Sequence, residues 1–188
     1  LAALRLSAAH LRSPKIAGLP PLTGGLVGYM GYDSVRRLEK LPTLSKKDID
    51  LPELAFMLTS DLAVMDHAEG TITLIANAIN WDGTGDRVDQ AYDDAQVRLD
   101  RMQSDLQGSL PGFVAELADN DSPDFSRNIS GDHYKAKILK AKEEIVAGEA
   151  FQIVLSQRFA MECTADALDV YRMLRLHNPS PYMYLFRF

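Results

Sequence analysis

Two apolar runs separated by a short polar turn constrain the fold of this chain more than any other feature of its sequence. Leu54–Asp66 and Thr71–Ile79 are rich in β-branched and large apolar residues, and the sequence His67-Ala68-Glu69-Gly70 lies between them. Runs of this kind, joined by a turn that contains glycine, are typical of an antiparallel hairpin. The sequence therefore predicts a hairpin over residues 54–79.

Helical periodicity is clearest over residues 86–106, directly after the predicted hairpin. Its apolar stripe consists of Val88, Ala91, Tyr92, Ala95, Leu99, Met102 and Leu106. Apolar residues spaced three or four positions apart form one face of a helix. The same spacing predicts helices over residues 132–147, with Gly148 as a C-terminal cap, and over 164–177, with Thr164 as the N-cap. Helices mixed with a hairpin indicate the α+β class.

The remaining segments complete the predicted order of elements. Residues 1–11 carry a short helical pattern, residues 34–40 one or two helical turns, and strands are expected at 24–33, 150–161 and 182–188. The polar stretch 108–123, which contains glycine and proline, is predicted to be a linker. It suggests two parts, residues 1–122 and residues 123–188, and both chain ends read as cuts inside a larger protein.

Bulk composition excludes several classes of protein. Of the 188 residues, 46% are hydrophobic and 24% charged, which is ordinary for a globular chain, and the net charge of −6 disfavours binding to nucleic acid or to anionic membranes. No apolar run is long enough to cross a membrane. Cys163 is the only cysteine, so an intrachain disulfide is impossible and a reducing, cytoplasmic setting is expected.

Common catalytic signatures are missing from the sequence. There is no phosphate-binding G-x-x-x-x-G-K-[ST] loop, and the spacing of Gly25, Gly28 and Gly31 lacks the helix start and acidic partner of a nucleotide site. The histidines are scattered and contain no H-E-x-x-H pair, which favours surface or capping roles over metal binding. The sequence alone therefore offers no acid–base pair and no metal site.

One segment, Gly148–Phe159, carries an unusual polar pattern. Written as a strand, it places the apolar side chains on one face, with Gln157 as the only polar interruption. The opposite face presents Gln152, Ser156 and Arg158 beside Val154. Such a face either meets solvent or forms the wall of a cleft that holds an anionic or hydroxylated ligand, and the pattern supports both interpretations.

Three runs resemble successive landmarks of the chorismate-utilising enzyme family. They are PPLTGGLVGYMGYD at residues 20–33, YKAKILKAKEEIVAGEAFQIVLSQRF at 134–159 and NPSPYMYLF at 178–186. They occur in the family's order and together span most of the chain. The runs IVLSQRF and NPSPYM resemble the anthranilate synthase large-subunit type of that family more than its aminodeoxychorismate branch.

The resemblance implies both a fold and a reaction. The implied fold is α+β, with two large, mostly antiparallel sheets packed together and flanked by helices, and residue 123 would begin the chorismate-binding region. The implied reaction is that of a lyase, which converts chorismate and ammonia to anthranilate and pyruvate. The ammonia would come from glutamine through an amidotransferase subunit, and Mg²⁺ would bind the carboxylates of chorismate. The family's metal-binding glutamates and catalytic histidine match no residue of this chain, so no catalytic residue is assigned here and the chain alone is expected to be inactive.

The resemblance also suggests a role for Gln152. Family members that use water as the nucleophile carry a lysine at this strand position, and lysine suits a base that activates water. An amide cannot accept that proton near neutral pH, whereas ammonia already carries a lone pair and needs no such base. We therefore expect Gln152 to face the chorismate cleft, with Ser156 and Arg158 as further parts of the cleft wall.

A regulatory site is implied at Pro181, Tyr182 and Met183. The family's effector pocket for L-tryptophan contains a Pro-Tyr-Met run, and proline rigidity, an aromatic face and a thioether all suit an indole ring. The pattern by itself favours a simpler interpretation, in which Pro179 and Pro181 end a helix and Tyr182 starts a core strand. A Leu-Leu-Glu-Ser-like run that forms the other half of the pocket is missing from this chain.

Two other classes of function remain open from the sequence. One is a ligand-binding regulatory module without chemistry of its own, which would equally lack acid–base and metal groups. The other is an unrelated α+β domain.

Overall fold

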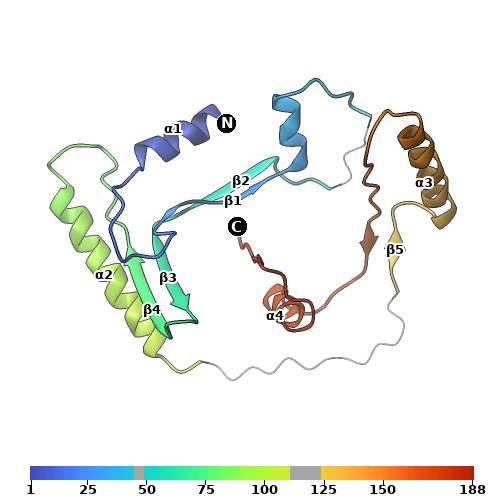
Figure 1. The fold of residues 1–188 in the computed structure, drawn as a ribbon. Helices are drawn as coiled ribbons and strands as arrows, with labels where there is room; N and C mark the ends of the chain where they lie inside the picture. Colours follow the sequence, from blue (N-terminus) through green and yellow to red (C-terminus); the bar gives the residue numbers. More distant parts are fainter. Residues whose placement is uncertain (45–48, 111–123) are drawn as a thin grey trace. The chain divides into compact units, whose positions relative to one another are not determined.

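The structure is a computed structural model that describes residues 1–44, 49–110 and 124–188. It divides into two compact units, Leu1–Pro111 with Phe186–Phe188, and Gly112–Leu185. Helices and antiparallel strands occur together, which confirms the predicted α+β class (Figure 1). The expected division at residue 122 and most of the predicted linker lie outside the described residues.

The first unit begins with helix α1 (Ala2–His10) and contains two antiparallel ladders. Strand β1 (Gly25–Met30) pairs with β2 (Leu54–Thr59), and β3 (Asp61–Asp66) pairs with β4 (Thr71–Ala76). A 3₁₀ helix, η1 (Tyr32–Arg37), follows β1 where one or two helical turns were predicted.

The hairpin predicted over residues 54–79 is shorter in the structure and covers Asp61–Ala76. Residues 54–59 form β2, which pairs with β1 in the other ladder. Ser60 separates β2 from β3, and its carbonyl accepts the last rung of the hairpin from the Asn77 amide at 2.9 Å. Thr59 at the end of β2 instead donates its hydroxyl to the Gly25 carbonyl at 2.8 Å. The apolar run over residues 54–66 therefore contributes one strand to each of two sheets. Alternation of side chains predicts that a segment is a strand but does not identify the strand with which it pairs.

Helix α2 (Val88–Gln107) confirms the strongest helical pattern and lies along the β3–β4 hairpin (Figure 1). Arg98 joins the helix to the hairpin, since its guanidinium pairs with Asp61 of β3 and donates to the Asn77 carbonyl at 2.9 Å. Asn77 donates its side-chain amide to the carbonyls of Thr23 and Ser60, both at 2.8 Å. One arginine and one asparagine thus connect α2, the open end of the hairpin and the segment that leads to β1.

The second unit contains strand β5 (Ser126–Arg127), helix α3 (Gly131–Val146), strand β6 (Phe159–Ala160) and helix α4 (Ala167–His177). Both helices begin at side-chain caps, with Ser130 Oγ accepting from the His133 amide at 3.3 Å and Asp166 Oδ1 from the Leu168 amide at 2.8 Å. The predicted N-cap Thr164 is therefore wrong by two residues, because the carboxylate of Asp166 satisfies the first helical amides instead. Gly148 adopts a φ of +84° after α3, as a glycine cap requires.

Two predicted strands differ in the structure. The one expected over 150–161 is reduced to β6, which pairs with β5, and residues 182–188 form no strand. A strand needs a partner, and within the described ranges only β5 reaches the first of these segments. At the end of the chain, Phe188 instead contacts the Tyr29 ring edge-on, with centroids 5.8 Å apart.

The apolar core of the described residues is small. Ala95 on α2 is the one apolar residue among them that is buried, and the strands carry mainly half-buried side chains. Large apolar residues such as Leu139, Val146 and Val154 remain exposed. Each unit therefore presents apolar surface that its own residues do not cover.

Candidate functional site

The segment that precedes β6 keeps the two-faced pattern predicted from its sequence between residues 152 and 158. Ile153, Leu155 and Gln157 are half-buried, whereas the side chains between them and Arg158 are exposed. Phe151 departs from the pattern, because it is exposed although it was expected on the apolar face. The three polar side chains predicted as a cleft wall, Gln152, Ser156 and Arg158, are thus all exposed.

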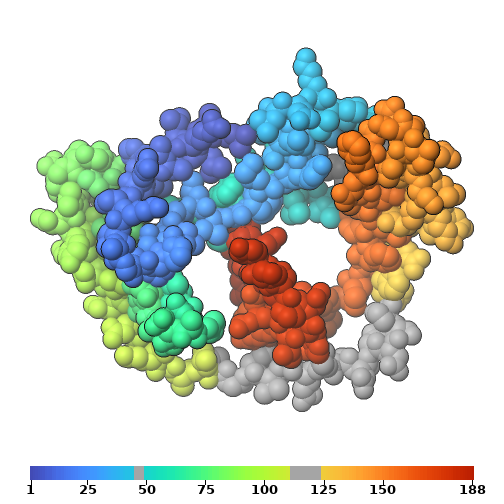
Figure 2. Space-filling view, viewed as in Figure 1, coloured from blue at the N-terminus to red at the C-terminus, as the bar shows by residue number. Residues whose placement is uncertain are grey.

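Residues 126–130 hold this segment in place. The Asn128 amide donates to the Arg158 carbonyl at 3.2 Å, and the Arg158 amide donates to Asn128 Oδ1 at 3.0 Å. Gln157 Nε2 donates to the Ile129 carbonyl at 3.0 Å, and this contact explains the polar interruption of the apolar face. In the space-filling view the segment lies beside β5 and is open to solvent on the visible side (Figure 2).

A cluster of two aromatic rings and one guanidinium lies at the C-terminal end of this segment, at the β5–β6 pair. The Arg127 guanidinium lies 5.2 Å from the ring centroid of Phe125 and 5.4 Å from that of Phe159. The two rings meet edge to face at 5.3 Å. These three contacts stabilise the β5–β6 pair beyond its short ladder.

The predicted effector residues belong to the same unit as the polar face. They follow α4, which ends at the Asn178 cap, and Ser180 Oγ donates to the Tyr182 carbonyl at 2.9 Å. Tyr182 is 88% exposed and Met183 is half-buried, so the aromatic ring is available to a ligand. Pro181 and Tyr182 form a bend, and Met183 follows it directly.

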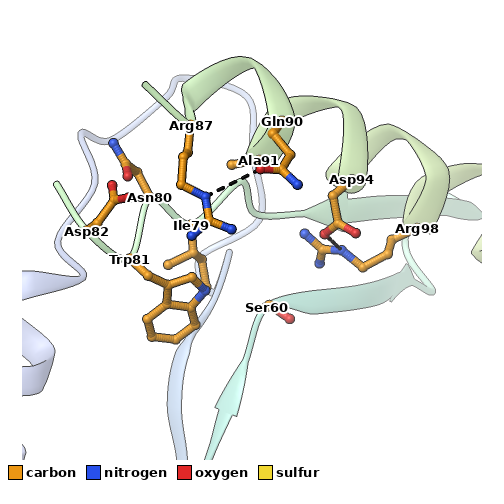
Figure 3. A pocket seen from close by; sticks show the side chains of 10 residues that line it. All are labelled: Ser60, Ile79, Asn80, Trp81, Asp82, Arg87, Gln90, Ala91, Asp94 and Arg98. Carbon is orange, nitrogen blue, oxygen red and sulfur yellow. Dashed lines mark hydrogen bonds and ion pairs between the residues drawn. The ribbon is translucent and has the colours of Figure 1, made fainter. Parts of the chain in front are cut away.

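The first unit contains a cavity of about 410 Å³ that sequence reasoning did not find. It lies between the loop after β4 and the start of α2, and Trp81, Arg87 and Gln90 reach into it (Figure 3). Its lining comes from positions spread over residues 60–98 and contains no recognisable motif.

Charges around this cavity are largely compensated by one another. Arg98 pairs with Asp94 at 2.9 Å in addition to Asp61 and the Asn77 carbonyl. The amide and then the hydroxyl of Thr84 donate to Asp82, which lowers the pKa of that exposed carboxyl. We therefore interpret the cavity as a gap left where α2 packs against the hairpin, and we assign it no ligand.

The described residues do not fit a magnesium ion. Among them, no three histidine, cysteine or acidic side chains gather where they could bind a metal. Mg²⁺ sites in proteins use carboxylates together with water or substrate oxygens. Neither the polar face at residues 152–158 nor the predicted effector residues 181–183 contain a carboxylate. We therefore assign no metal ligand and no metal-dependent step to this chain. No helix in the described part of the chain is long and apolar enough to span a membrane.

The class defined by these observations is an α+β protein with a polar extended segment held next to a helix N-terminus. The chain belongs to the chorismate binding enzyme family, whose sequence pattern it matches over residues 2–188. This match confirms the family resemblance of the three sequence runs.

Individual relatives place the chain more narrowly within that family. It is 52% identical to anthranilate synthase component 1 of Mycolicibacterium smegmatis over 98% of this chain and 35% of that protein. It is 45% identical to the Arthrobacter globiformis protein of the same name, over 98% of this chain and 35% of that protein. The crystal structure of anthranilate synthase component I from Streptococcus pneumoniae superposes with a TM-score of 0.78 and 27% identity, over 96% of this chain and 40% of that one. The chain thus spans about a third of the length of these curated relatives.

Proposed function

We propose that this chain is part of an anthranilate synthase large subunit. The full-length lyase would convert chorismate and ammonia to anthranilate and pyruvate in tryptophan biosynthesis, in the cytoplasm. A separate amidotransferase subunit would supply the ammonia from glutamine. The observation that carries the proposal is the 52% identity to a component 1 protein over nearly the whole chain.

We further propose that Gln152 faces chorismate in the assembled enzyme and that Ser156 and Arg158 line the same cleft. The exposure of all three side chains supports this assignment. Gln152 has no proton-accepting group near neutral pH, which is compatible with ammonia as the nucleophile. In the full-length enzyme, residues outside this chain would hold the magnesium ion.

A chimeric enzyme tests the proposed reaction. Residues 1–188 replace the matching segment of the Mycolicibacterium smegmatis relative, and anthranilate fluorescence is followed with chorismate, an ammonium salt and Mg²⁺. We expect the chimera to form anthranilate and the isolated chain to form none, since no cluster of metal-binding side chains is found among the described residues. Formation of 4-amino-4-deoxychorismate by the chimera, or of no amino product, would contradict the proposed reaction.

The effector assignment leads to a second expected result in the same chimera. Pro181, Tyr182 and Met183 are proposed to contact L-tryptophan, which would inhibit the enzyme. The Met183→Ala change removes a thioether contact to the indole ring, so we expect about a tenfold higher tryptophan concentration for half-inhibition. Initial rates are measured over a tryptophan titration.

The matched control for this experiment is Met173→Ala, a methionine change on α4 in the same unit. It should leave the inhibition curve in place. If the Met183→Ala enzyme retains activity and its tryptophan inhibition curve coincides with that of the control, the run Pro181-Tyr182-Met183 is not the effector site.

A further inference from the structure

The polar face at residues 152–158 has little backbone support of its own. Within the described residues, the ladder that reaches this part of the chain is β5–β6, and it covers only Phe159 and Ala160 on this side. An extended chain without ladder bonds can rotate or slip, and a shift by one residue moves every side chain to the opposite face. The position of Gln152, Ser156 and Arg158 therefore depends on contacts at the C-terminal end of the segment.

Gln157 makes a side-chain contact that helps to fix this end. It is half-buried, and its Nε2 donates to the Ile129 carbonyl at 3.0 Å. Ile129 immediately precedes Ser130, whose hydroxyl caps α3. The amide of Gln157 thus ties the segment to the start of a sixteen-residue helix. Its sequence neighbours Ser156 and Arg158 are exposed, in keeping with alternation of side chains along an extended segment.

Asn128 supports the same register, since its main-chain amide donates to the Arg158 carbonyl and its side-chain Oδ1 accepts from the Arg158 amide. These two bonds fix the position of residue 158 along residues 126–130. The Gln157 bond to the carbonyl of Ile129, the residue after Asn128, adds a side-chain anchor at the preceding residue and restrains its rotation.

We propose that Gln157 is a positioning residue for the ligand-binding face of Gln152, Ser156 and Arg158. It does not touch the substrate. Its donor holds the face at a fixed register and rotation against the N-terminus of α3. This inference rests on the proposed chorismate function of the face, but the contact itself can be tested without substrate.

The test compares Gln157→Met and Gln157→Lys in the chimeric enzyme. Methionine keeps the length and volume of the side chain but has no donor, whereas lysine retains an N–H donor of similar reach. We expect Gln157→Met to raise the KM for chorismate about tenfold, the equivalent of one lost hydrogen bond, with kcat changed less than about twofold. Gln157→Lys should restore most of the lost affinity.

Amide hydrogen exchange provides the measurement that does not depend on activity. The Arg158 amide is hydrogen-bonded to Asn128 Oδ1, so its exchange should accelerate in Gln157→Met and return toward the parent rate in Gln157→Lys. An inactive parent chimera that still shows this exchange pattern would reject the proposed function and keep the positioning role. Unchanged exchange and KM in Gln157→Met, or equal losses in both variants, would overturn the positioning role itself.

Discussion

Replacing Gly28 with alanine is expected to lower the free energy of unfolding by about 3 kcal/mol, because the added methyl group meets backbone that cannot move aside. A Cβ at Gly28 would lie 2.0 Å from the Ala55 carbonyl oxygen and 2.7 Å from the Phe56 Cα. Both atoms belong to β2, the partner strand of β1. Relief of the clash requires the two strands to separate, so the β1–β2 ladder itself should be lost.

Urea-induced unfolding of the chimeric enzyme, followed by circular dichroism, measures this effect. Gly85→Ala is the matched control, because a Cβ there has no heavy atom within 4 Å and the backbone is not left-handed. The control should unfold at the urea concentration of the parent. Coincident unfolding curves for Gly28→Ala and Gly85→Ala would show that β1 and β2 do not approach as closely as the structure indicates.

Replacement of Arg98 by methionine is the second large expected effect. The change removes the ion pairs with Asp61 and Asp94 and the hydrogen bond to the Asn77 carbonyl. The Arg98 and Asp61 side chains are 27% and 34% exposed, so solvent weakens the electrostatic part, and we expect a loss of about 2 kcal/mol. Most of that loss comes from leaving Asp61 and the Asn77 carbonyl without their donor.

Arg101→Met, on the same helix, is the control for charge and helix propensity. Arg101 is 83% exposed and lies 3.9 Å from Asp105, so its removal should cost less than about 0.5 kcal/mol. Unfolding of both variants in urea gives the difference directly. Equal midpoints for the two variants would mean that Arg98 does not anchor α2 to the hairpin.

The helices and the family assignment could be predicted from the sequence. The hydrogen bonds of a helix join residues four apart, so the apolar period that predicted residues 86–106 already contains most of what determines α2 (Val88–Gln107). Three ordered runs likewise indicated the chorismate-utilising family, which the match over residues 2–188 confirmed. The roles predicted for Gln152 and for Pro181, Tyr182 and Met183 stay predictions.

The partners of the strands were decided only by the tertiary structure. The sequence could show that residues 54–59 favour a strand, but the choice of β1 over β4 depends on the close approach that Gly28 permits and on the bonds of Asn77 to Thr23 and Ser60. The side-chain amide of Gln157 donates to the carbonyl of Ile129, which lies 28 positions earlier in the chain. Strand pairs and side-chain ties of this kind join residues that are distant in sequence, so no local period reports them.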